Sequence, residues 1–458
     1  MIRTLIRKEM LDQILSIRFS ISLILACVFL VPATYILAED HGWLDKERGP
    51  FMKEGFYPRK SWYYLNRRVP SMGVLATGLD QELSLSCQNE GLGAGPLFHN
   101  LTFVHNPNRY FFSSLDFVFF INIVGSLMAF AFTYDAISGE RQRGTLRLTM
   151  TQPIARPLFL LSKFLGSYIS FAISIAPALM GVILVLILHP DVELRASEWE
   201  ATGFLLLLAM LYLAGFFMLG LFVSCVTRTP KTTLTALLTL WTILVLVIPN
   251  FSPFLASKLR PIRSLHEVEA EIAAMRRDYR EPTRQKADDF IQRHRGNQET
   301  MNEAEQETVR EMWDEYGRQT MKLRTTGEAA KIRIAFLNEV EAQAKMGETL
   351  SLISPAAAFI FLASDIAQTG LESERDYRRA VFRYRRQYGE YQDQQIEETG
   401  DYGSAFHAAN ADTAPAFVYR SISLSQAVGA HIPQFMVLVL YSVLFFFAAQ
   451  IAFIRAPL

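Results

Sequence analysis

One short polar stretch in the first half of the chain combines residue types that could do chemistry. Residues 136–146 read AISGERQRGTL, and Arg147 follows directly. The two glycines permit turns and close backbone approach, and the arginines are suited to bind phosphate or carboxylate groups. The stretch is therefore either a loop that takes part in nucleotide hydrolysis or a structured element with another task.

Nucleotide hydrolysis by this chain is not supported by its sequence. The Ser-Gly pair followed by a polar residue, Gln and Arg resembles the signature loop of ATP-binding-cassette ATPases, but Glu140 stands where that loop has its second consecutive glycine. Binding of the phosphates also needs a G-x-x-x-x-G-K-[ST] run, which the sequence lacks. The run GLGAGPLF at 91–98 has glycines but no lysine. We therefore predict no catalytic, metal-ligating or cofactor-binding residue.

The elements that position this stretch are membrane spans. The chain has 458 residues, half of them hydrophobic, and its 45 Lys and Arg balance its 45 Asp and Glu, so net charge favours neither an acidic nor a basic partner. A helix needs about 20 apolar residues to cross a bilayer core of about 30 Å. We predict an all-α polytopic membrane protein with six spans, at residues 20–38, 112–134, 164–188, 203–226, 232–250 and 434–454.

The basic residues of the short loops predict the orientation. Between spans two and three, five basic residues stand against Glu140, whereas the loop 189–200 holds four acidic residues and one arginine. Because Lys and Arg are retained on the cytoplasmic side, both termini and residues 135–163 should be cytoplasmic. No cytoplasmic segment is then long enough for an ATPase domain, and we expect the chain not to be an enzyme.

Two long connections should face outward. Residues 39–111 are rich in Pro, Gly and aromatic residues and predict a compact cap, irregular or with short strands. Residues 251–433 predict a large helical domain, in which 265–346 form two amphipathic helices or a helical hairpin with Val268 and Ile272 on the apolar face. The apolar run 353–363 is too short to span, so it should pack on the membrane surface or inside the protein. Acidic residues match the basic ones at 374–395, so we expect no nucleic acid partner.

The polar stretch itself has the composition of a short surface helix between two spans. Ser138 is suited to cap the helix, and Glu140 suits its positively polarised first turn. The arginines should face the cytoplasm, with Leu146 and Leu148 toward membrane or protein, and Pro153 should end the helix. An ordinary basic loop is the alternative, but the Gly and Pro punctuation favours a structured element that another protein can push.

Residues 134–166, YDAISGERQRGTLRLTMTQPIARPLFLLSKFLG, resemble the coupling segment of ABC-2 type transporter permeases. The similarity is strongest to the permeases of gliding-motility and nitrous-oxide-reductase maturation systems. It rests on Gly139 with Glu140, on the run 144–146, on Pro153 with Arg156, and on Lys163. The N-terminal residues IRTLIRKEMLDQIL also resemble that family's interfacial helix (1–19), and ISPAAAF at 353–359 occurs at a similar place.

This resemblance implies a permease subunit in a bacterial cytoplasmic (inner) membrane. Two such subunits, identical or different, would pair, and each coupling helix would sit in a groove of a separate ABC ATPase that binds the ATP and Mg. Glu140 and the arginines would then make salt-dependent contacts with the ATPase, and Gly144 would allow close approach. The residues implied in ATPase coupling are Gly139, Glu140, Arg141, Arg143, Gly144, Thr145, Arg147, Pro153 and Arg156.

Other classes of membrane protein are less consistent with the sequence. An ion-coupled transporter would carry charged residues within its spans, and these spans hold essentially none. A metalloprotease would need an H-E-x-x-H run, and His266 with Glu267 has no second histidine at that spacing. A force-transmitting or structural membrane protein, acting on an extracytoplasmic partner without substrate passage, remains open. The large outer regions indicate an extracytoplasmic protein as a further partner, beside membrane lipid.

Overall fold

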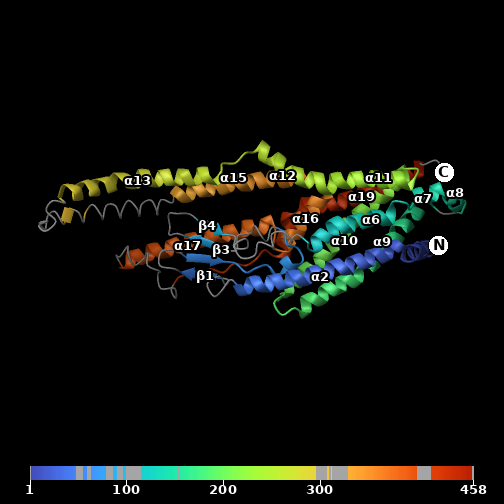
Figure 1. Cartoon of the computed structure of the whole chain (residues 1–458), viewed down its shortest axis with the longest axis horizontal. Helices are drawn as coiled ribbons and strands as arrows, with labels where there is room; N and C mark the ends of the chain where they lie inside the picture. The colour runs from blue at the N-terminus through green and yellow to red at the C-terminus, as the bar shows by residue number, and fades with distance from the viewer. Residues whose placement is uncertain are drawn as a thin grey trace.

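The protein is an elongated helical structure, seen here in a computed structural model (Figure 1). Both termini lie at one end of a helical bundle, called here the proximal end, and the distal end carries a sheet and further helices. The structure describes residues 2–47, 55–58, 63–78, 86–89, 96–99, 115–152, 155–294, 307–308, 311, 328–399 and 414–455.

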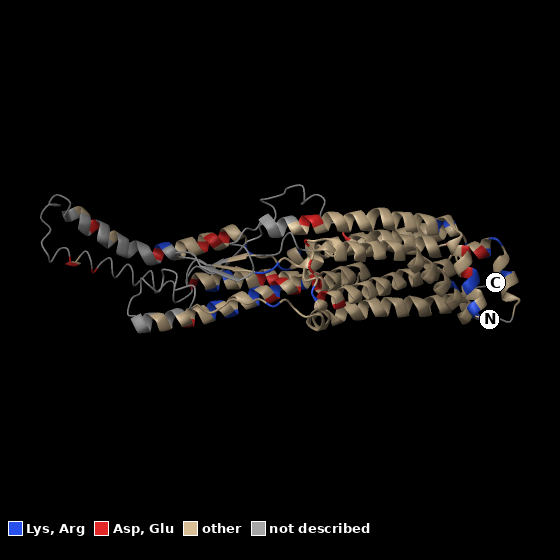
Figure 2. Ribbon diagram, turned by 90° about the horizontal axis from the view of Figure 1, so that it is seen from below, with Lys and Arg blue, Asp and Glu red and all other residues tan. Residues whose placement is uncertain are grey.

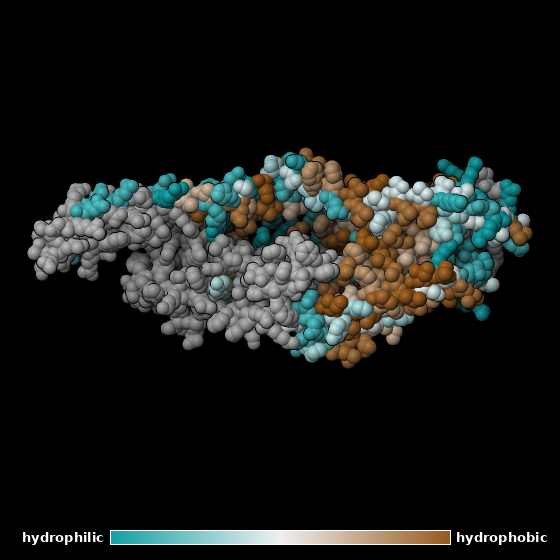
Figure 3. Space-filling view, in the orientation of Figure 1, coloured by the Kyte–Doolittle hydropathy of each residue, from teal (hydrophilic) through white to brown (hydrophobic). Residues whose placement is uncertain are grey.

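Six helices of the described chain are long and apolar enough to cross a membrane, which confirms the predicted fold class and number of spans. Figure 2 shows few charged residues along the bundle, and Figure 3 shows a hydrophobic surface over it. The spans are α2 (Ile17–Glu47, apolar to Gly42), Phe117–Gln142 (α5 Phe117–Phe119, η2 Phe120–Gly125, α6 Ser126–Thr133 and α7 Ser138–Gln142), α9 (Arg156–Leu188), α10 (Ala196–Val226), Pro230–Leu259 (α11 Pro230–Trp241, η3 Thr242–Val247 and α12 Ile248–Leu259) and α19 (Ile432–Arg455).

Helix α10 is the most buried of the six spans and forms the centre of the bundle. It packs along α19 and α6, and small residues permit the close approach. A Cβ atom at Gly220 would lie only 2.0 Å from Thr133 Oγ1 of α6. On another face, the Tyr212 ring stacks on Phe359 of α16 (Pro355–Ile366), with 4.6 Å between ring centroids. The short apolar helix α16 is therefore buried inside the protein, one of its two predicted positions.

The distal region contains the predicted short strands. Four antiparallel strands form one sheet in the order β1 (Gly55–Pro58), β2 (Tyr63–Asn66), β3 (Ser86–Asn89) and β4 (Pro96–His99). Helix α17 (Leu371–Thr399) packs on this sheet, where Tyr377 and Val381 share an apolar cluster with Leu65 and Cys87. The Tyr377 hydroxyl donates to the Leu65 carbonyl at 2.6 Å, which fixes the helix to β2. A short 3-10 helix, η1 (Ser71–Val74), follows the second strand.

A two-helix arm extends from the distal end. Helices α13 (Leu265–His294) and α15 (Glu328–Ser351) lie side by side (Figure 1), as the apolar spacing predicts. Val268 and Ile272 are buried against Ala329 of the second helix. Helix α15 also packs along α12, so the arm is joined directly to the fifth span.

A buried charged cluster connects the distal region to the last span. His431 follows α18 (Leu424–Ala430), and its Nε2 lies 2.5 Å from Asp365 Oδ2 while its Nδ1 lies 3.4 Å from Glu348 Oε1. Burial alone would lower the pKa of His431, but its hydrogen bonds to Asp365 and Glu348 outweigh burial and raise the pKa to about 9. Asp365 also accepts from the backbone N–H of Ser373 at 3.2 Å. The imidazolium therefore joins α15, α16 and α19.

Candidate functional site

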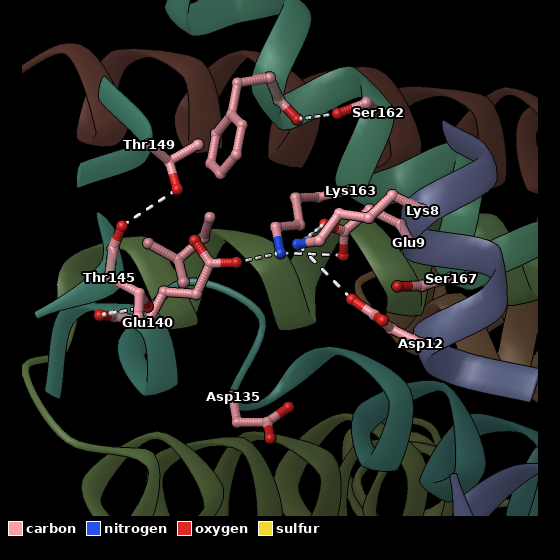
Figure 4. Close-up of polar contacts among 12 residues, drawn as sticks. Lys8, Glu9, Asp12, Asp135, Glu140, Thr145, Thr149, Ser162, Lys163 and Ser167 are labelled. Atoms are coloured by element: carbon pink, nitrogen blue, oxygen red, sulfur yellow. Dashed lines mark hydrogen bonds and ion pairs between the residues drawn. The ribbon is translucent and has the colours of Figure 1, made fainter. Parts of the chain in front are cut away.

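The residues singled out by their chemistry lie on α7, α8 and the adjoining chain at the proximal end of the bundle (Figure 1), and Figure 4 shows the polar contacts around Glu140 and Lys163. The expected single surface helix is instead two short ones, α7 (Ser138–Gln142) and α8 (Thr145–Met150). Gly144 joins them in the left-handed region, with φ of 75°. A Cβ atom at Gly144 would meet nothing within 4 Å, so the glycine is required here by the backbone angle and not by a neighbour within this chain.

A buried ion cluster holds α7 in place. Lys163 Nζ lies 2.8 Å from Glu9 Oε2 and 2.5 Å from Glu140 Oε1. The three residues are between 4% and 8% exposed, so the charges are almost fully removed from solvent. The Lys8 Nζ lies 3.2 Å from the other oxygen of Glu9 and adds a second positive charge beside the two carboxylates. Partial burial lowers the pKa of Lys8, but Glu9 and Glu140 outweigh it and raise the pKa overall.

Gly166 makes this cluster possible. Helix α1 (Ile2–Ile14) lies on α9, and a Cβ atom at Gly166 would come within 2.5 Å of Glu9 Cβ. A larger side chain at this position would therefore push α1 away and withdraw the Glu9 carboxylate from Lys163. Sequence reasoning missed Glu9, and the available signal was weak, because Glu9 is one of two acidic residues, with Asp12, in the N-terminal segment.

Arg141 and Ser138 differ from their predicted orientations. Arg141 turns inward, and its guanidinium donates to the carbonyls of Thr227 at 2.6 Å and Cys225 at 3.1 Å, at the end of α10. These carbonyls have no partner within the helix, so the half-buried Arg141 satisfies them. Ser138 does not cap α7, because its hydroxyl donates back to the Tyr134 carbonyl at 2.9 Å. Ser224 of α10 instead accepts the backbone N–H of Ser138 at 3.1 Å.

An ion pair beside the cluster joins the second span to the start of α2. Arg18 donates to both carboxylate oxygens of Asp135, at 2.8 and 2.7 Å. The guanidinium also lies over the Tyr134 ring, 4.8 Å from its centroid. A bidentate pair of this kind fixes orientation as well as distance. The ion pair therefore connects the turn that precedes α7 to α2.

Five of the exposed residues of this segment are called here the proximal tip: Arg143, Gly144, Thr145, Arg147 and Leu148. Leu148 is 72% exposed, whereas Leu146 is buried against Phe159 and Phe453. Arg143 at the end of α7, and Arg147 and Leu148 on α8, are therefore exposed, while Leu146 of α8 is fixed in the bundle.

The remaining predicted residues lie around this surface. Gly139 is buried, and a Cβ atom there would lie 3.1 Å from Asp135 Cβ. Arg156 donates to the Ile454 carbonyl at 2.6 Å, at the end of α19. Pro153 lies outside the residues that the structure describes. The structure thus brings Glu140 into the protein and leaves Arg143, Gly144, Thr145 and Arg147 at the surface.

Comparison with known proteins shows similarity to membrane transporters. The family described as ABC-2 family transporter protein matches residues 3–456. A protein from Pseudomonas aeruginosa named probable ABC transporter permease protein NosY is 38% identical over 95 residues. That alignment covers 19% of this chain and 34% of the relative, so it spans about a third of the relative's length. The family match, by contrast, includes the bundle and both distal regions.

Proposed function

The chain belongs to the ABC-2 family of transporter proteins, and from this premise we propose that it is a permease subunit driven by a separate ATPase. It pairs with a second permease subunit, identical or different. The ATPase subunit binds and hydrolyses ATP with Mg, and this chain holds no cofactor of its own. The permease moves a substrate across the bacterial cytoplasmic (inner) membrane or extracts it from that membrane. The proximal end, with both termini, faces the cytoplasm.

The proximal tip is the observation that best supports this proposal. An exposed apolar residue near exposed arginines is typical of a docking surface, because the apolar anchor supplies affinity and the charges supply orientation. Burying Leu148 in a groove of the partner would contribute about 2 kcal/mol. Arg143 and Arg147 both precede it in the sequence and are placed to pair with acidic residues of the ATPase.

The buried contacts behind the tip would transmit its movement. Glu140 ties α7 to Lys163 of α9 and, through that lysine, to α1, while Arg141 ties it to the end of α10. Removing one member of a buried ion pair typically costs about 3–5 kcal/mol. The segment therefore resists sliding, and a push on the tip would tilt the spans behind it.

These positions support a division of roles between the charged residues. Glu140 is 8% exposed and paired inside the protein, so we assign it to transmission. The exposed Arg143 and Arg147 are assigned to contact with the ATPase.

A second candidate function is supported by the arm formed by α13 and α15. The arm is packed on α12, which belongs to the fifth span, so tilting that span would swing the arm. A protein that used this motion to act on an extracytoplasmic partner would need the same ATPase but no substrate path through the bundle.

Affinity capture tests the proposal. The protein is extracted gently from native membranes through a C-terminal tag, and the co-purifying proteins are identified by mass spectrometry. We expect a stoichiometric soluble ATPase, and we expect Leu148→Asp to lose it. Arg260→Glu, an exposed arginine at the opposite end of the fifth span, is the matched control and should retain it.

Two results distinguish the candidate functions. Substrate movement in reconstituted vesicles that requires the ATPase supports the permease, whereas ATPase stimulation with no transported substrate supports the force-transmitting protein. If the chain is recovered only with itself and stimulates no ATPase, both proposals fail.

A further inference from the structure

A recess lined by arginines lies at the distal end of the bundle, far from the proximal tip. Its volume is about 30 Å³, and it lies between the chain that follows β2, the start of α10, and the chain on either side of α17. Arg67, Arg68 and Arg195 line it, together with the carboxylate of Glu198. None of these residues takes part in the proposed coupling to an ATPase, so the recess requires a separate explanation.

Arg67 forms a fixed wall of the recess. It is 2% exposed, its Nη2 lies 3.4 Å from Glu374 Oε2, and its guanidinium lies 4.9 Å from the centroid of the Tyr377 ring. The carboxylate of Glu374 therefore balances its charge. Arg67 sets the shape of the recess, and the ligand charge must be matched by the other two arginines.

The accessible charges of the recess leave one positive charge in excess. Arg195 is exposed and Arg68 is half-buried, with one nitrogen of Arg68 donating to the Glu193 carbonyl at 3.0 Å. Glu198 is already engaged, because its Oε2 accepts the backbone N–H of Arg195 at 2.7 Å at the start of α10. Two guanidinium groups against one carboxylate match a ligand with one negative charge, and a planar guanidinium suits a phosphate group.

Gln368 contributes a neutral donor at some conformational cost. Among the described residues it is the single non-glycine residue with positive φ, at 64°, and it lines the recess. A left-handed backbone costs a residue with a Cβ atom roughly 1–2 kcal/mol, which glycine would avoid. The helix end accounts for this angle, because Gln368 directly follows Ala367, the C-cap of α16, and the Thr369 N–H donates to the Ser364 carbonyl at 2.9 Å. The end of α16 thus places a side-chain amide in the lining of the recess.

Two hydroxyl groups complete the lining. Ser421 is exposed, and Tyr419 is buried, with its hydroxyl 3.4 Å from the Ser373 carbonyl. Burial raises the pKa of Tyr419 to about 12, so this phenol stays neutral and adds no negative charge near an anion.

The level of the recess along the spans is that of lipid headgroups. Trp199 lies on α10 four positions after Arg195. Tryptophan gathers at the membrane–water boundary, and four residues of helix rise about 6 Å. The headgroup layer is roughly 5–7 Å thick on each side of the hydrocarbon core. With Trp199 at the membrane–water boundary, Arg195 would lie at the height of a phospholipid phosphate.

We propose that this recess binds a phosphate group with one negative charge, carried by an anionic phospholipid or by a soluble phosphate ester. Arg68 and Arg195 pair with the phosphate oxygens, and Gln368 donates a further hydrogen bond. Arg67 holds the wall against which the phosphate rests.

The experiment measures ligand binding by the purified full chain in a neutral detergent. Phosphatidylglycerol and glycerophosphoglycerol, a soluble phosphate diester with the same single negative charge, are the two probes, diacylglycerol with the same acyl chains is the phosphate-free control, and native mass spectrometry gives the affinities. Arg68→Gln and Arg195→Gln should each weaken binding about tenfold, the effect of losing one charge-assisted hydrogen bond. Arg260→Gln, an exposed arginine at the distal end of the fifth span, should change nothing. Arg195→Lys keeps the charge and should retain most of the affinity.

The outcomes separate the two sources of phosphate. Weakened phosphatidylglycerol binding in both recess variants supports a lipid headgroup, and weakened glycerophosphoglycerol binding alone supports a soluble ester. Equal binding by the wild type, both recess variants and Arg260→Gln would overturn the proposal, as would diacylglycerol binding as tightly as phosphatidylglycerol. Arg68 and Arg195 both reach the surface, and size-exclusion profiles will show whether the variants fold.

Discussion

Replacing Lys163 with methionine should weaken the hold on the N-terminal helix and on α7. In the wild type, one ammonium lies 2.8 Å from a Glu9 oxygen and 2.5 Å from a Glu140 oxygen, and both glutamates are at most 8% exposed. Without it, two buried carboxylates face each other with only the exposed ammonium of Lys8 nearby. Loss of one partner from a buried charged group costs about 3–5 kcal/mol, so we expect a destabilisation of that size.

The assay combines unfolding in denaturant with amide hydrogen exchange. Lys163→Met should lower the free energy of unfolding, and exchange should accelerate in α1 and α7, because the cluster fixes both to α9. The triple variant Glu9→Gln, Glu140→Gln and Lys163→Met removes all the buried charges and should recover most of the lost stability. Replacing a buried ion pair by neutral groups is often nearly neutral.

One result would refute this reasoning. If Lys163→Met changes the free energy of unfolding by less than about 1 kcal/mol and leaves exchange in α1 unaltered, the cluster does not hold the helix, since exposed ion pairs contribute no more than this. A triple variant as unstable as the single one would instead show that packing of the lysine stem, and not its charge, is lost.

Three further perturbations have defined outcomes. The pKa of His431 is raised in the folded protein to about 9 from an ordinary 6.5, so the stabilisation by its charge is complete below pH 6.5 and is lost as pH rises through 9. The melting temperature of the wild type should therefore fall between pH 6.5 and 9, and that of His431→Gln should change less. Gly166→Val should separate α1 from α9, because a Cβ atom there meets Glu9 Cβ at 2.5 Å. A pair of cysteines introduced across the two helices should cross-link efficiently when Gly166 is present and should fail to cross-link in Gly166→Val. Glu140→Ala should preserve capture of the ATPase while uncoupling ATP hydrolysis from transport in vesicles. Normal transport by this variant would contradict the role of Glu140 in transmission.

Long apolar segments and helical periodicity were predictable because both are local properties. Apolar runs of bilayer length identify spans, and the spacing of Val268 and Ile272 identifies the packed face of the arm. The four strands were predictable only as short strands within an irregular cap, because their pairing depends on residues far apart in the sequence.

The orientation of the site residues was harder to predict because it depends on distant partners. Lys163 is separated by 154 positions from Glu9, and nothing local indicates that they meet. Arg141 belongs to the same short stretch as the exposed Arg143 and Arg147, but it turns inward because the carbonyls at the end of α10 lie beside it. From the sequence, Gly144 could have been needed either for close approach of two backbones or for a turn. Its φ of 75° shows that it is needed for a turn.

Helix α10 has the mechanical properties of a lever. Its 31 residues span about 46 Å without an internal proline or π segment, so it tilts more readily than it bends. A rotation of about 5° would displace one end by about 4 Å relative to the other at this length. Its proximal end is fixed to Arg141, and its distal end lines the arginine recess. Bending is left to its neighbours, since α9 contains Pro177 and the second and fifth spans contain π segments.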